Sequence, residues 1–398
     1  MNNQFRHLKL QIDSLAVFRS VKNDVAVSRL CDLLEALADG KGPEETISIY
    51  SSVVECLYPV SSDLGDYVSK LVTEDENFYI KAVAAGITVA DEIRRAVDNE
   101  LSVLQTLAML DAGTIKEAIG YDDFLPAWTN GTVDIAYDFH LKLNNIMQTG
   151  YGIFAKYDFF RLENGVIVPV SHPDYQSLDQ LFGYERERNL IMKNTEALVK
   201  GTGANNMLLY GDAGTGKSST IKAVAAHFAP QGLRIIEVKK TQLYQIPGIM
   251  EELSLNPLKF VIFIDDLSFS GNDDNFSALK ATLEGSISGT SSNVAIYATS
   301  NRRHLVKESF ADRSGDELHT NDTLQETMSL AARFGLTITF QKPGKDEYLN
   351  IVKSLAVEYG IEMDEEELFK KAEAHAIRKH GRSPRTAKQF IELLKIGI

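Results

Sequence analysis

Residues 207–220 read Met207-Leu208-Leu209-Tyr210-Gly211-Asp212-Ala213-Gly214-Thr215-Gly216-Lys217-Ser218-Ser219-Thr220. A short apolar run leads into a glycine-rich turn, and apolar residues then recur at helical spacing. Such a turn aims backbone N–H groups at phosphate oxygens, and the helix that follows adds the positive end of its dipole at the same point. In this pattern Lys217 reaches the outer phosphates and Ser218 supplies a hydroxyl to Mg²⁺. Residues 211–219 therefore predict a nucleotide-binding site.

Length and composition bound the class of protein. A chain of 398 residues suggests two or three domains at about 150 residues each. We find no secretory N-terminus and no apolar run near the roughly 20 residues that cross a bilayer, so we expect a cytoplasmic protein without a membrane span. Cys31 and Cys56 lack the spacing of a metal site, which indicates free thiols.

The negative charge lies mainly in the N-terminal part. Residues 1–150 hold 12 Lys and Arg against 23 Asp and Glu, a balance of −11, whereas residues 151–398 hold 29 against 32, a balance of −3. An acidic surface repels phosphate backbones. Nucleic-acid binding is therefore possible through a local basic groove elsewhere in the chain, but is not favoured.

Periodicity divides the chain into four parts. Residues 1–150 are mostly helical, with helices expected near 76–85, 89–109 and 114–119. Asn164-Gly165 between two β-prone runs predicts a hairpin, and we assign 151–174 to a connector. Residues 175–342 alternate helix and strand, which predicts an α/β core with a parallel sheet covered on both faces. Residues 343–398 form a small helical subdomain. The expected core strands are 206–210, 233–238, 260–264, 294–299 and 337–340.

Polar residues follow two of the expected strands. Asp265 and Asp266 come directly after the buried run 260–264. Asp265 is placed to hold a water on Mg²⁺, and Asp266 to orient or deprotonate the attacking water. Many nucleotidases with a phosphate loop of this kind use Glu at this position. The Asp266 side chain is one methylene shorter, which could slow the attack of water on the phosphate. Asn301 follows the next strand, and its amide could contact the γ-phosphate or the water.

Arg385 lies in the first turn of a helix that Ser383 caps and Pro384 begins. A cation at this position opposes the helix dipole. Helix stabilisation therefore explains Arg385 poorly, and we expect it to meet an anion.

Together these motifs resemble those of AAA+ ATPases in order and spacing. They are Gly211–Ser218 as Walker A, Phe260–Asp266 as Walker B, residues 298–301 at the next strand tip, the pair Arg333-Phe334, and the helix that carries Arg385. The segments 208–211, 232–234, 265–269, 299–305, 329–330 and 333–336 resemble more narrowly an uncharacterised bacterial AAA+ family known only as a domain of unknown function. The resemblance covers about residues 175–398 and leaves the N-terminal region out.

The resemblance implies further roles. Asn301 corresponds to the sensor-1 amide, Arg385 to the sensor-2 arginine, and Arg333 to the arginine finger given to a neighbouring subunit. The segment Phe182-Gly183-Tyr184 is similar to one that lies against adenine. Ala332 stands where an acidic residue is expected before the finger, and Arg302 and Arg303 are alternative cationic contacts.

The leading hypothesis is an AAA+ ATPase that uses ATP and Mg²⁺ to remodel a macromolecular partner chosen by the N-terminal domain. A finger in trans requires two subunits per site, so we expect an ATP-dependent ring or spiral of identical subunits. Two alternatives stay open. One is an ATP-gated switch or scaffold with slow turnover, and the other is a loader acting on DNA or on a helicase.

Overall fold

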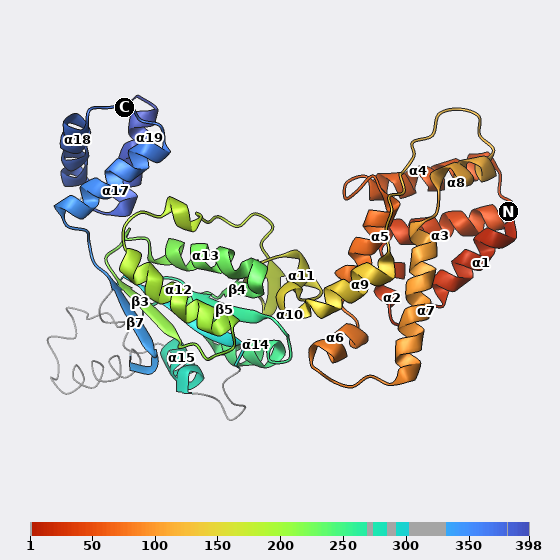
Figure 1. The fold of residues 1–398 in the computed structure, drawn as a ribbon, viewed down its shortest axis with the longest axis horizontal. Helices are drawn as coiled ribbons and strands as arrows, with labels where there is room; N and C mark the ends of the chain where they lie inside the picture. The colour runs from red at the N-terminus through yellow and green to blue at the C-terminus, as the bar shows by residue number, and fades with distance from the viewer. Residues whose placement is uncertain (1, 269–273, 285–291, 302–331, 380, 398) are drawn as a thin grey trace. The chain divides into compact units, whose positions relative to one another are not determined.

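The structure is a computed structural model that describes residues 2–268, 274–284, 292–301, 332–379 and 381–397 (Figure 1). The chain divides into two compact units, Met1–Lys156 and Tyr157–Ile398. In the described residues no helix is both long and apolar enough to cross a membrane.

The first unit is all helical. Its helices are α1 (Asn2–Asp13), α2 (Arg19–Lys22), α3 (Val25–Ala38), α4 (Pro43–Leu57), α5 (Leu64–Thr73), α6 (Phe78–Ala84), α7 (Asp91–Ala108), α8 (Ala112–Ile119), α9 (Ile135–Asn144), α10 (Ile146–Thr149) and α11 (Ile153–Lys156). The three helices predicted in this region are α6, α7 and α8.

Short polar side chains begin several of these helices, and one buried carboxylate joins two of them. The side chains of Asp24, Asp63 and Asp111 accept hydrogen bonds from the first backbone N–H groups of α3, α5 and α8, which satisfies donors that a helix start leaves unpaired. Glu100 on α7 is 8% exposed. It accepts from the N–H groups of residues 16–18, which fixes the turn after α1.

The second unit contains a seven-stranded sheet. The strands are β1 (Phe159–Glu163), β2 (Val166–Pro169), β3 (Met207–Gly211), β4 (Leu233–Glu237), β5 (Lys259–Ile264), β6 (Val294–Ser300) and β7 (Leu336–Phe340). Their order is β2-β1-β4-β5-β6-β3-β7. Among the strands that the structure describes, only the β1–β2 pair is antiparallel. The five predicted core strands are β3 to β7, within one residue at each end.

The predicted hairpin forms but is not a separate connector. Asn164 and Gly165 have φ values of +50° and +83°, and Glu163 pairs with Val166 across the turn. β1 then pairs in parallel with β4, so the hairpin extends the sheet. The assignment of 151–174 to a connector is corrected accordingly, because β1 satisfies the edge of β4 that would otherwise lie unpaired.

Helices cover the sheet and give a three-layer α/β core (Figure 1). They are α12 (Glu185–Val199), α13 (Lys217–Phe228), α14 (Ile246–Leu253) and α15 (Asp274–Glu284), with 3₁₀ turns at Leu178–Gln180, Ala229–Gln231 and Lys240–Gln245. Ile191 and Leu198 of α12 and Ile221 and Val224 of α13 share one buried cluster with strand residues such as Leu209.

The described residues after β7 form a helical subdomain of α17 (Lys345–Glu358), α18 (Glu365–Arg378) and α19 (Pro384–Lys395). Their core includes Tyr348, Val352, Ala372 and Ile391. This helical subdomain touches the core directly, since the N–H of Arg385 donates to the carbonyl of Gly214 at 3.2 Å.

Candidate functional site

The phosphate loop runs from the end of β3 to the start of α13. β3 lies between β6 and β7, so the loop emerges beside the ends of both neighbours. Gly211 has a φ of +140°, and a Cβ built on it would lie 2.0 Å from the carbonyl oxygen of Phe340. Gly216, with a φ of +90°, precedes the first helical residue. Only glycine fits these conformations, so the turn depends on the residues that the sequence pattern singled out.

Lys217 is folded back on the loop. Its side chain is 5% exposed, and Nζ donates to the carbonyls of Gly211 and Asp212 at 3.0 and 2.7 Å and to Oδ1 of Asn301 at 3.0 Å. Burial lowers the pKa of the Lys217 ammonium, while nearby carboxylates act in the opposite direction. The cation lies at the mouth of the loop with three neutral oxygen partners that an anion could replace.

Asp265 joins the loop to the neighbouring strand tips. Its Oδ1 accepts from the hydroxyl of Ser218 at 2.6 Å and from the hydroxyl of Thr299 at 2.5 Å. A hydroxyl beside a carboxylate is the donor set that Mg²⁺ takes in phosphate sites. The described residues contain no group of three or more His, Cys, Asp or Glu placed to hold a metal. If a magnesium ion bound here, Ser218 and Asp265 would be the residues placed to hold it, with water and phosphate supplying the other ligands.

Asp266 follows in a left-handed conformation with a φ of +51°. Its N–H donates to the Thr299 hydroxyl at 3.0 Å, and its Oδ1 accepts from Nδ2 of Asn301 at 2.8 Å. The Asn301 amide thus bonds to Lys217 through its oxygen and to Asp266 through its nitrogen. The structure brings Lys217, Ser218, Asp265, Asp266 and Asn301 into one hydrogen-bonded group.

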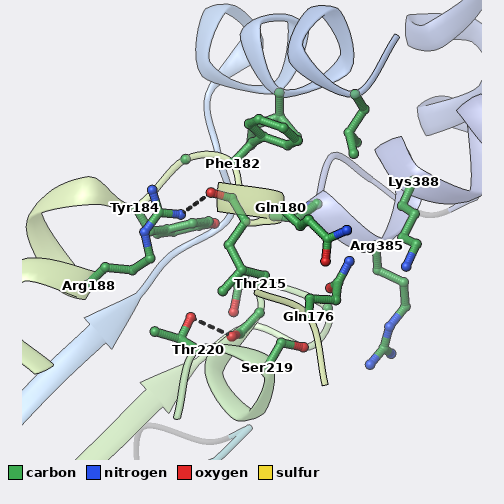
Figure 2. A pocket seen from close by; sticks show the side chains of 17 residues that line it. Gln176, Gln180, Phe182, Tyr184, Arg188, Thr215, Ser219, Thr220, Arg385 and Lys388 are labelled. Carbon is green, nitrogen blue, oxygen red and sulfur yellow. Dashed lines mark hydrogen bonds between the residues drawn. The ribbon is translucent and has the colours of Figure 1, made fainter. Parts of the chain in front are cut away.

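A cavity of about 190 Å³ adjoins the phosphate loop (Figure 2). The loop and α13 contribute Gly214, Thr215, Gly216, Ser219 and Thr220 to it, the segment before α12 contributes Gln176, Gln180, Leu181, Phe182, Gly183, Tyr184 and Arg188, and the helical subdomain contributes Ile351, Leu355, Pro384, Arg385 and Lys388. The lining therefore mixes apolar side chains with polar and charged ones, beside the backbone of the phosphate loop.

Tyr184 lines this cavity but is mostly held by the core. Its ring stacks on Phe340 with centroids 5.1 Å apart, and its hydroxyl donates to the carbonyl of Gln341 at 2.5 Å. Burial raises the pKa of the phenol. Gly183 has a φ of +78°, and a Cβ built on it would lie 2.9 Å from Cδ1 of Ile351 on α17. The segment 182–184 therefore contacts both the α/β core and the helical subdomain.

Arg385 lies at the start of α19, where Ser383 accepts from the N–H of Thr386 at 3.1 Å. Arg385 lines the cavity beside the loop, and its contact with an anion stays a prediction. Lys388 follows one turn later and lines the same cavity (Figure 2).

Arg333 lies just before β7 and is partly buried, and Ala332 beside it is exposed. Arg333 does not line the cavity described above, so its role as a finger stays a prediction. Arg302 and Arg303 lie outside the residues that the structure describes.

Sequence reasoning missed some residues of the site. Thr299 was read as part of a strand tip only, although its position directly before Ser300 and Asn301 placed it beside the aspartates. Lys388 follows Arg385 at helical spacing, which could have indicated a shared face. Gln176, Gln180 and Arg188 carry no local signal, because only the folding of their segment brings them to the loop.

Comparison with known families identifies the second unit. Residues 154–397 match the model of the family described as "Protein of unknown function (DUF815)". The chain belongs to this family. The DUF815 match covers both the sheet, with the phosphate loop that follows β3, and the helical subdomain. No curated protein matches the chain.

Solved structures of RuvB from Thermotoga maritima also align. A RuvB mutant aligns with 18% identity and a TM-score of 0.38 over 55% of this chain and 64% of its own. Another structure, described as the RuvB Holliday junction branch migration motor, aligns with 17% identity and a TM-score of 0.33 over 56% and 74%. This chain thus spans less than two thirds of the first of these proteins.

Proposed function

We propose that this chain is an AAA+ ATPase that hydrolyses ATP with Mg²⁺ and uses the change to rearrange a macromolecular partner bound by its N-terminal unit. The observation that carries the proposal is the group formed by Lys217, Ser218, Asp265, Asp266 and Asn301. Asn301 links the Lys217 cation to the Asp266 carboxylate, and the Asp266 N–H links this pair to Asp265 and Ser218, beside a cavity that borders the phosphate loop.

Each residue has a chemical part in this proposal. The loop N–H groups and Lys217 bind the phosphates, with Lys217 exchanging carbonyl and amide oxygens for phosphate oxygens. Ser218 and Asp265 hold Mg²⁺, which neutralises charge that develops on the phosphate oxygens when it is bound. Asp266 orients a water and accepts its proton as the water oxygen bonds to the γ-phosphorus and the bond to the ADP oxygen breaks. Asn301 keeps that water in place.

Phosphate release offers a physical route from hydrolysis to movement. Arg385 lies on the helical subdomain, and its backbone N–H already bonds to Gly214 of the loop. An anionic γ-phosphate that attracts the Arg385 side chain draws the subdomain toward the core, and its loss removes that attraction. The acidic N-terminal unit would convey this movement to its partner.

The test is turnover of Mg·ATP by the full chain. Lys217→Ala should abolish nucleotide binding, and Asp266→Asn should keep binding and stop hydrolysis. Lys222→Ala on the same helix is the control, because Lys222 contacts only Glu237 at 3.8 Å among the ion pairs described. Normal hydrolysis by Asp266→Asn would overturn the assignment of the base, and tight ATP binding by Lys217→Ala would overturn the site itself.

A second candidate is a switch that binds ATP and turns over slowly. It is favoured by Asp266, whose short side chain is already bonded to Asn301. The two candidates differ in turnover, since a remodeller accelerates by orders of magnitude when its partner is added and a switch does not. A loader acting on nucleic acid would instead show a salt-sensitive gel shift with single-stranded DNA.

Self-assembly is part of the proposal. If Arg333 completes a neighbour's site, the contact between subunits is head-to-tail and closes into a ring or continues as a spiral. Light scattering that shows monomers at saturating ATP would contradict this.

A further inference from the structure

The tip of β6 carries a residue whose contacts converge on both aspartates. Thr299 is 2% exposed and pairs with Leu209 of β3 in the sheet. Its hydroxyl donates to Oδ1 of Asp265 at 2.5 Å and accepts from the N–H of Asp266 at 3.0 Å. Its carbonyl accepts from the N–H of Leu267 at 2.7 Å. Three successive residues leaving β5 are therefore fastened to one threonine.

The first of these contacts concerns the rotamer of Asp265. Its Oδ1 receives the hydroxyls of Ser218 and Thr299 and the N–H of Asp266. Ser218 is itself at the proposed metal site, so it is free to leave this bond when its hydroxyl oxygen binds a cation. The bond from Thr299 comes from a buried residue on a central strand. With the N–H of Asp266, it keeps Asp265 aimed at Ser218 in either case, and it is the shorter of these two bonds.

The second contact concerns the backbone of Asp266. A φ of +51° lies in the left-handed region, which aspartate enters more readily than most residues but which neighbouring contacts must still select. The hydroxyl and the carbonyl of Thr299 hold the peptide groups before and after this residue. The direction of the Asp266 carboxylate, and hence its bond to Asn301, follows from them.

We propose that Thr299 is a positioning residue for the proposed reaction, setting the metal-binding carboxylate of Asp265 and the water-orienting carboxylate of Asp266 through one hydroxyl. This inference rests on the proposed function. Partners of this kind that orient a metal ligand are worth about 10- to 100-fold in metal affinity or activity when removed. Thr299 acts through the two aspartates and does not itself touch substrate.

The experiment uses the full chain and a fluorescent ATP analogue titrated with protein, in EDTA and across a Mg²⁺ series. Thr299→Val keeps the shape and removes the hydroxyl, and Thr299→Ser keeps the hydroxyl. The control is Thr195→Val, because the Thr195 hydroxyl is buried and bonds to Ile191 and Tyr297 but to neither aspartate. Thermal unfolding of each variant reports the loss of stability alone.

The Mg²⁺ midpoint is the Mg²⁺ concentration that gives half of the increase in affinity for the ATP analogue. We expect this midpoint to rise by about 10- to 100-fold in Thr299→Val, while the affinity for the analogue in EDTA stays unchanged. Turnover should fall in kcat and recover in part at high Mg²⁺. Thr299→Ser should resemble the unmodified chain, and Thr195→Val should lose stability without a Mg²⁺ shift. Should Thr299→Val not fold, Thr299→Cys, with its weaker thiol donor, takes its place with the same expectation.

Two results overturn the inference and are distinguishable. In the first, the unmodified chain binds and hydrolyses Mg·ATP, but the Mg²⁺ midpoint of Thr299→Val equals that of the unmodified chain or moves no further than that of Thr195→Val. The inference then fails and the proposed function stands. If the unmodified chain binds no nucleotide with or without Mg²⁺, both fail together.

Discussion

Replacing Gly211 by alanine should unfold the second unit at much lower denaturant than the same change at Gly216. Both glycines lie in the phosphate loop, with φ values of +140° and +90°. A Cβ at Gly211 would lie 2.0 Å from the carbonyl oxygen of Phe340, whereas a Cβ at Gly216 meets no atom within 4 Å. The pair separates backbone strain from collision with β7.

The magnitudes follow from these contacts. Strain at a φ that L-residues avoid costs about 1–3 kcal/mol, and this is the whole expectation for Gly216→Ala. At Gly211 the collision is with backbone, so β7 must also move away from β3. That movement breaks ladder bonds such as the one from Asp212 N–H to Phe340 oxygen at 3.1 Å, each worth about 1 kcal/mol. We expect Gly211→Ala to lose about 3–5 kcal/mol of unfolding free energy.

Urea unfolding measures this, with hydrogen exchange on peptides from β3 and β7 to follow the second unit. At a urea dependence of about 2 kcal/mol per molar, such a loss moves the midpoint by about 2 M. Trp128, the single tryptophan, is buried in the first unit, so its fluorescence is an internal control that should not change. Equal midpoints for Gly211→Ala and Gly216→Ala would refute the close packing of the loop on β7.

Four further outcomes are expected. Tyr184→Phe should lower the stability of the second unit by about 1 kcal/mol in urea, because it removes the bond to the Gln341 carbonyl; an unchanged midpoint would contradict this. Arg385→Ala should weaken the binding of ATP more than the binding of ADP in a fluorescence titration. Equal losses of affinity would show that Arg385 does not interact with the γ-phosphate. Asn301→Ala should still bind Mg·ATP but lose turnover. Quenched-flow measurements distinguish the binding step from the hydrolysis step. Burial raises the pKa of Cys31 to about 11. Iodoacetamide at pH 8 should therefore label Cys31 only when the first unit unfolds. Rapid labelling of the folded protein would contradict the burial of Cys31.

The sheet and the phosphate loop could be predicted because their signals are local. Gly211, Gly214 and Gly216 mark positions that need positive φ, and apolar runs such as 260–264 mark buried parallel strands. The place of the hairpin could not be predicted in this way. Asn164-Gly165 fixes the turn, but the pairing of β1 with β4 depends on backbone edges that carry no residue signature.

The candidate site shows the same division. Asp265, Asp266 and Asn301 were predicted together because parallel strands end at one edge of the sheet, and the structure brings them into contact. Thr299 was missed, because a threonine inside a β-prone run is explained by strand propensity alone. Its importance depends on the left-handed turn at Asp266, which no local pattern announces.

The most direct test of the account is ATP hydrolysis per subunit, measured across a wide range of protein concentration for the unmodified chain and for Arg333→Ala. The account predicts a specific activity that rises with concentration as subunits assemble, and that disappears in Arg333→Ala while nucleotide binding remains. A slow rate that is independent of concentration and unaffected by the substitution would contradict an active site shared between subunits.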